Sequence, residues 1–80
     1  MFKIYSVYDS KAQLFGLPFF LPNDDVASRE FVRLSGDVNS LVSQFPDDFK
    51  LFCLGVFSPE EGKIVYNSYV VGSAPVFSDE

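Results

Sequence analysis

The sequence predicts an α+β fold, in which a small and mostly antiparallel sheet of three or four strands carries one or two helices packed on one face. Alternating patterns near both ends of the chain predict strands, and apolar spacings of three and four between them predict helices. The chain has 80 residues, of which 48% are hydrophobic and 18% aromatic. That length supports one core, so residues 1–80 are expected to form a single domain.

The first strand is expected from Phe2 to Tyr8, where side chains alternate between two sides. Lys3, Tyr5 and Val7 share one of these sides. The polar residues that follow favour a turn, because Asp and Ser side chains bond to nearby backbone groups.

A second extended segment is expected from Leu14 to Leu21, an apolar run that Gly16 and Pro18 interrupt. Proline has no backbone N–H to donate to a neighbouring strand. The segment is therefore expected to be an edge strand or a packed loop.

A helical region is expected next, because Asn23 and Asp24 can cap free amide groups and suit the positive end of a helix. Gly36 is expected to end the first helix, and Asp37 to cap a short second one. Seven apolar residues recur at helical spacing and predict one buried face: Ala27, Phe31, Leu34, Val38, Leu41, Val42 and Phe45.

Two strands joined by a hairpin are expected in the last third of the chain. Phe49–Phe57 is apolar on both faces, which predicts a central strand. Ser58–Gly62 supplies the turn, with Gly62 available for a positive φ, and Ile64–Val71 is rich in strand-forming residues. Residues 72–80 are expected to form a loose tail or a docked arm.

The composition excludes several kinds of chemistry. Eleven acidic and six basic residues give a net charge of −5, the opposite of a protein that wraps duplex DNA. The chain has no His and one Cys, which excludes the usual zinc sites, Ser-His-Asp triads and Cys-His dyads. We therefore expect that the protein is not an enzyme and binds no metal or cofactor. Cys53 is expected to be a buried structural thiol. Without a long apolar run or a signal peptide, we expect a soluble, cytoplasmic protein with no membrane partner.

Charged residues cluster in two ways. Three pairs of adjacent acids are expected to be solvated caps and turn residues: Asp24-Asp25, Asp47-Asp48 and Glu60-Glu61. Arg29 and Arg33 lie four residues apart and should share a helix face with Asp25 and Asp37. This row is expected to form solvated ion pairs, with phosphate contact as the alternative.

Cations and rings also share strand sides, since period two aligns Lys3 with Tyr5 and Lys50 with Phe52. If the two strands are neighbours, these side chains would share one sheet surface, the combination that single-stranded nucleic acid prefers. The alternative is that Phe52 belongs to the core and the lysines protect a sheet edge.

Short blocks of sequence between Tyr5 and Gly62 occur in a characteristic order. The blocks are Val7–Ala12, Pro18-Phe19-Phe20 with Pro22-Asn23, Arg29 with Phe31, Pro46–Phe49 with Leu51-Phe52, and Leu54-Gly55 with Phe57. Together they resemble the small non-structural protein of gokushoviruses, which are single-stranded-DNA phages of the Microviridae and whose family is described as DNA-binding. The resemblance implies a phage protein that is made in the bacterial cytoplasm, is absent from the capsid, and acts in genome replication or packaging.

Two functions follow from these observations. The first is single-stranded DNA binding through residues that offer cations or rings: Lys3, Tyr5, Lys11, Lys50 and Phe52, with Arg29 and Arg33 on phosphates. The alternative is a homodimer that contacts a phage or host replication protein without direct DNA binding. The expected edge near Leu14–Leu21 and the large aromatic fraction motivate this alternative.

Overall fold

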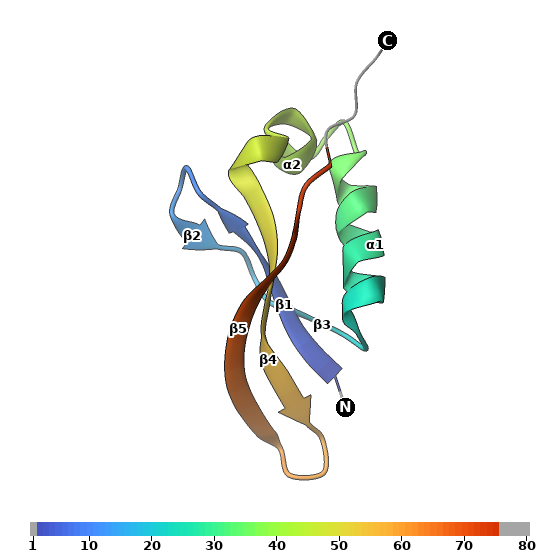
Figure 1. Ribbon diagram of the computed structural model, residues 1–80, viewed down its shortest axis with the longest axis vertical. Coiled ribbons are helices and arrows are strands. Elements are labelled where there is room, and N and C mark those ends of the chain that lie inside the picture. The colour runs from blue at the N-terminus through green and yellow to red at the C-terminus, as the bar shows by residue number, and fades with distance from the viewer. Residues whose placement is uncertain (1, 76–80) are drawn as a thin grey trace.

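The fold is a five-stranded antiparallel sheet with helices on one face (Figure 1). The structure is a computed structural model, and it describes residues 2–75. The predicted α+β class is confirmed. The sheet has five strands because the second extended segment forms two short ones. The elements in chain order are β1 (Phe2–Asp9), β2 (Leu14–Phe15), β3 (Phe19–Leu21), α1 (Asp24–Ser35), α2 (Leu41–Gln44), the short 3₁₀ helix η1 (Pro46–Asp48), β4 (Phe49–Ser58) and β5 (Lys63–Ser73).

The strand order is β2-β1-β4-β5, and β3 pairs with the same edge of β1 as β2 does. The prediction of an edge for Leu14–Leu21 is therefore confirmed. The break between β2 and β3 contains Pro18. The Ser6 hydroxyl donates to the Gly16 carbonyl oxygen at 2.7 Å, which holds this break against β1.

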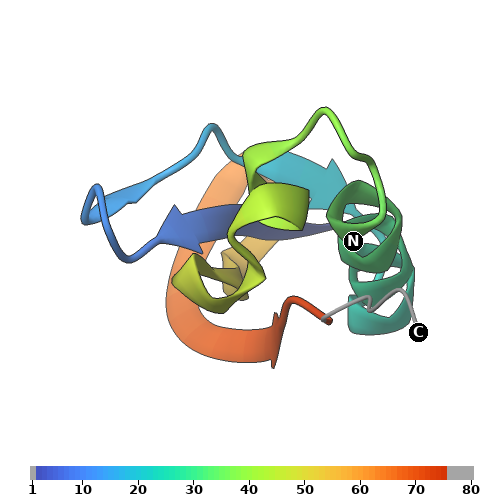
Figure 2. The ribbon, with the colours of Figure 1, turned by 90° about the horizontal axis from the view of Figure 1, so that it is seen from above.

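The predicted central strand is also confirmed, because β4 lies between β1 and β5. The β4–β5 hairpin is long and extends beyond the end of α1 (Figure 1). Its turn contains Gly62 at φ 61°, as predicted from the sequence. Seen from above, β5 curves away from β1, so the sheet is strongly twisted (Figure 2).

Helix α1 begins and ends where the sequence predicts. The side chain of Asn23 accepts a hydrogen bond from the Val26 N–H at 2.9 Å, and Gly36 follows the last helical residue. The prediction that Asp37 caps the second helix is wrong. Ser40 caps α2, because its side chain accepts a hydrogen bond from the Ser43 N–H at 3.0 Å. Asp37 lies in the preceding turn, where its side chain accepts a hydrogen bond from the Asn39 N–H.

The hydrophobic core lies between the helices and one face of the sheet. Its buried members are Tyr5, Ala27, Phe31, Val42, Phe49, Leu51, Cys53 and Ala74. Three residues of the predicted helix face are instead exposed, namely Val38, Leu41 and Phe45. The chain leaves α1 at Gly36, so the helical spacing of these later residues no longer relates them to the core.

The end of the chain lies only partly within the described residues. β5 continues to Ser73 and Ala74 is buried, so the start of the predicted tail belongs to the sheet. Residues 76–80 lie outside the described part of the chain. Within residues 2–75, no helix is long and apolar enough to cross a membrane.

Candidate nucleic-acid interface

Three aromatic side chains form a cluster on the sheet face opposite the helices. The ring centroids of Tyr8 and Phe15 are 4.7 Å apart, those of Phe15 and Phe52 are 5.2 Å apart, and those of Tyr8 and Phe52 are 5.9 Å apart. The cluster forms because Tyr8 is paired with Phe15 across β1 and β2, while Phe52 follows on the adjacent strand β4. We call these three residues the ring cluster.

Lys50 adds a cation to the ring cluster. It is the partner of Tyr8 across β1 and β4, and it lies two positions before Phe52 on the same side of β4. Its side chain is exposed, and it makes no ion pair within residues 2–75. A cation beside accessible rings is suited to a phosphate followed by a stacked base.

Lys3 and Tyr5 do not belong to this surface, so the prediction that they share one face with Lys50 and Phe52 is wrong. The strands are indeed neighbours, but Tyr5 is paired with Cys53, a core residue on the helix side. The register decides the face, because neighbouring positions on a strand point to opposite sides. Tyr5 is fully buried and offers no ring face for stacking.

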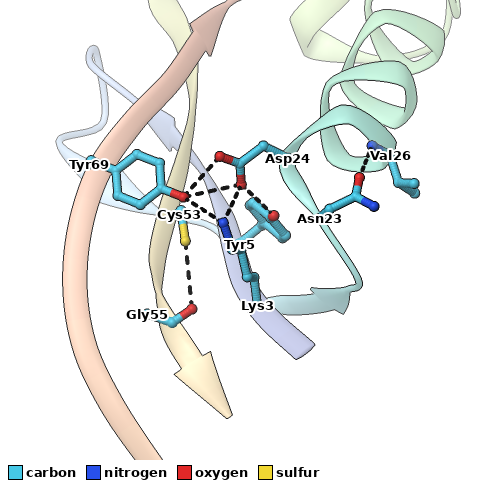
Figure 3. A network of polar contacts seen from close by, with 8 residues as sticks. All are labelled: Lys3, Tyr5, Asn23, Asp24, Val26, Cys53, Gly55 and Tyr69. Carbon is cyan, nitrogen blue, oxygen red and sulfur yellow. Dashed lines mark hydrogen bonds and ion pairs between the residues drawn. The ribbon is translucent and has the colours of Figure 1, made fainter. Parts of the chain in front are cut away.

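A polar network around Asp24 explains where Lys3 and Tyr5 are used instead (Figure 3). The Tyr5 hydroxyl donates to Oδ1 of Asp24 at 2.6 Å, and the Tyr69 hydroxyl donates to Oδ2 of Asp24 at 2.9 Å. The Nζ of Lys3 lies 3.5 Å from Oδ1 of Asp24 and donates to the Tyr69 hydroxyl at 3.2 Å. Side chains from β1 and β5 thereby hold the first turn of α1 against the sheet.

The network shifts the protonation of its members. The hydrogen bond from Tyr5 is the main cause that holds the pKa of Asp24 below its ordinary value. Burial acts in the opposite direction, and the hydrogen bond from Tyr69 and the charge of Lys3 add to the lowering. Burial, followed by the hydrogen bond to Asp24, raises the pKa of Tyr5. The hydrogen bond to Tyr69, with the charge of Asp24, raises the pKa of Lys3. The ammonium group of Lys3 is therefore paired with the Asp24 carboxylate inside the fold.

The remaining predicted cations are dispersed. Arg33 forms an ion pair with Glu30 at 3.2 Å rather than with Asp37. Arg29 is exposed and lies on the same helix, α1. This helix covers the face of the sheet opposite to Lys50. Lys11 lies in the turn after β1, beside a hollow that α2 helps to line. Of the seven predicted site residues, the structure therefore places only Lys50 and Phe52 together on the uncovered face.

Sequence reasoning missed two members of the ring cluster and one of the polar network. Tyr8 and Phe15 come together through strand pairing, and Tyr69 reaches Asp24 from 45 positions along the chain. The alternation that puts Tyr8 opposite Tyr5 was a usable signal for Tyr8. Cys53 is buried, as predicted.

The acidic pairs and other candidate ligands form no metal site in the described part of the chain. Within residues 2–75, no three His, Cys, Asp or Glu side chains come together in a way that could hold a metal ion. Asp24 instead binds hydroxyl and ammonium groups, while Asn23 before it provides the cap.

Comparison with known proteins identified the family of the chain. A family model described as "Phage ORF5 protein" matches residues 2–74, a range that includes every helix and strand of the fold. No curated protein and no solved structure matches the chain.

Proposed function

Because the chain belongs to the Phage ORF5 protein family, we propose that it is a non-structural phage protein that binds single-stranded DNA inside the infected bacterium. The proposed role is binding without bond breaking, in replication or packaging of the genome. The resemblance to the gokushovirus protein supports this ligand, since those phages carry single-stranded genomes.

One observation carries the proposal: a cluster of three mutually contacting rings lies beside Lys50 on a sheet face that no helix of residues 2–75 covers. Phe15 is 47% exposed, so its ring is accessible to a base. The four residues come from β1, β2 and β4, and a single strand lying across these elements would meet rings and the ammonium group in turn.

The charges set the expected strength of binding. Each stacked base contributes on the order of 1–3 kcal/mol, whereas each phosphate contact contributes a slope of about −0.7 in log affinity against log salt. Within residues 2–75, strand pairing places one cation, Lys50, beside the rings, and the whole chain carries a charge of −5. Binding should therefore be weak, and its salt dependence shallow.

The experiment is a fluorescence-anisotropy titration of labelled single-stranded DNA at two salt concentrations. Phe15→Ala should weaken binding by roughly 5- to 160-fold, the equivalent of one lost stacking contact of about 1–3 kcal/mol. Phe20→Ala is the matched control, because Phe20 is 50% exposed and belongs to the other short strand on β1. Lys50→Gln should flatten the salt dependence, whereas Lys63→Gln in the distant hairpin should not.

The proposal fails if the wild-type protein shows no saturable binding at high micromolar concentration. It also fails if Phe15→Ala and Phe20→Ala weaken binding equally, because the ring cluster would then have no special part. The first result would favour the alternative function, contact with a replication protein.

A further inference from the structure

The two edges of the sheet differ in how they are protected. On one side, β2 and β3 have two and three residues, with Pro18 between them. Short strands and proline are common ways of preventing a sheet edge from pairing with another chain. On the other side, β5 has eleven residues, and no strand of the described chain pairs with its outer edge.

The β5 edge also lacks the charges that usually protect an edge. From Ile64 to Gly72, nine successive residues are uncharged in a protein with seventeen charged residues. None of them is proline. The register of β5 against β4 shifts at two places, but a strand without charges or proline still presents its outer backbone groups as a template for another extended strand.

Much of the apolar surface of β5 is exposed. Ile64 is 63% exposed, Tyr66 76% and Val70 51%, and Val65 is exposed on the other side of the strand. These side chains stand on the two faces of the strand, so pairing at its edge would bury the outer backbone of β5 and only part of each side chain. The interface would therefore lie at the small end of the range for specific protein contacts, as expected for a dimer that dissociates on dilution.

From these observations we infer that the outer edge of β5 is the docking site for β5 of a second copy, in an antiparallel pair with two-fold symmetry. Identical uncharged strands meet without like charges, even though the chain carries a net charge of −5. The arrangement closes on itself, because both copies use the same edge, and the short strands β2 and β3 give little support for pairing at the other edge. The result is a dimer rather than a fibre.

This edge differs from the one predicted from the sequence. Leu14–Leu21 does form an edge, but its strands are too short to hold a partner. The β5 edge lies beside the ring cluster, because Val70 of β5 is the cross-strand partner of Phe52, whereas Tyr8 and Phe15 lie on the strands beyond β4. Pairing at the outer edge of β5 would therefore extend the sheet next to the proposed DNA surface of each copy.

The test compares the full-length protein with two variants by sedimentation over a range of micromolar concentrations. The wild-type protein should form dimers that dissociate on dilution. Tyr66→Lys places a charge on the edge of each copy and should weaken dimerisation at least tenfold. Leu17→Lys adds the same charge at a site that is 90% exposed, between β2 and β3, and should leave the dimer unchanged.

Amide hydrogen exchange locates the interface in the wild-type protein itself, without relying on a variant that folds. Outward-facing amides between residues 64 and 72 should be protected at high concentration and exchange rapidly at low concentration, while those at 16 and 17 should not respond. A wild-type monomer at high micromolar concentration overturns the inference. So does equal weakening by both variants, or concentration-dependent protection confined to another segment.

Discussion

Replacing Tyr5 by Phe removes one hydroxyl and leaves the ring in the core. That hydroxyl donates to the Asp24 carboxylate at 2.6 Å, a short hydrogen bond to a charged acceptor. Such bonds contribute about 1.5–3 kcal/mol to stability, and water can replace part of this one because the Asp24 side chain is 37% exposed. We therefore expect Tyr5→Phe to lower the free energy of unfolding by about 1.5 kcal/mol, the lower end of that range.

The assay is urea unfolding followed by circular dichroism, with the slope against urea unchanged. Tyr8→Phe is the control, because its hydroxyl makes no hydrogen bond within residues 2–75; its effect should stay within about 0.5 kcal/mol. In combination with Asp24→Asn, the loss from Tyr5→Phe should shrink, since both substitutions remove the same interaction. Equal losses for Tyr5→Phe and Tyr8→Phe, or fully additive losses in the double variant, would refute the role of the network.

Three further predictions concern the fold. Because the network holds the pKa of Asp24 below its ordinary value of 3.8, its contribution to stability is present above that value and is lost as the pH falls through the lower folded pKa; in acid titrations, the stability difference between wild type and Asp24→Asn should be constant near neutral pH and shrink in this acidic range. Gly55→Ala should destabilise the protein by more than about 2 kcal/mol in thermal unfolding, since a Cβ there would clash with the backbone oxygen of Val65; an unchanged melting temperature would contradict this. Asn23→Ala should cost about 1 kcal/mol, because the first turn of α1 loses the acceptor for the Val26 N–H, and Asn23→Asp should retain most of the wild-type stability in the same measurement.

Local patterns in the sequence were sufficient to predict most of the elements. The alternation after Phe2 predicted β1, the capping residue Asn23 and Gly36 bounded α1, and the turn at Gly62 predicted the hairpin. These features depend on residues within a few positions of one another, where propensities and capping act directly. The α+β class followed from their order along the chain.

The candidate site depended on contacts between distant parts of the chain. The sequence indicated that Lys50 and Phe52 share a strand side, and the structure agrees. It could not show which side of β1 enters the core, because both sides carry large apolar residues. Pairing of Tyr5 with Cys53 decided this and placed Lys3 in the Asp24 network instead of on the ring surface.

The sequence by itself therefore determined that the chain lacks the residues of the usual zinc sites and Ser-His-Asp triads, and where its local elements lie. Both depend only on residue types and short spacings. The tertiary structure alone decided the strand register, the partners of the cations and which sheet edge stays open. Each strand can expose either side until it is paired, and a shift of one residue exchanges its two faces. For this reason, the position of the ring cluster and the β5 edge that no strand of residues 2–75 covers became visible only in the folded chain.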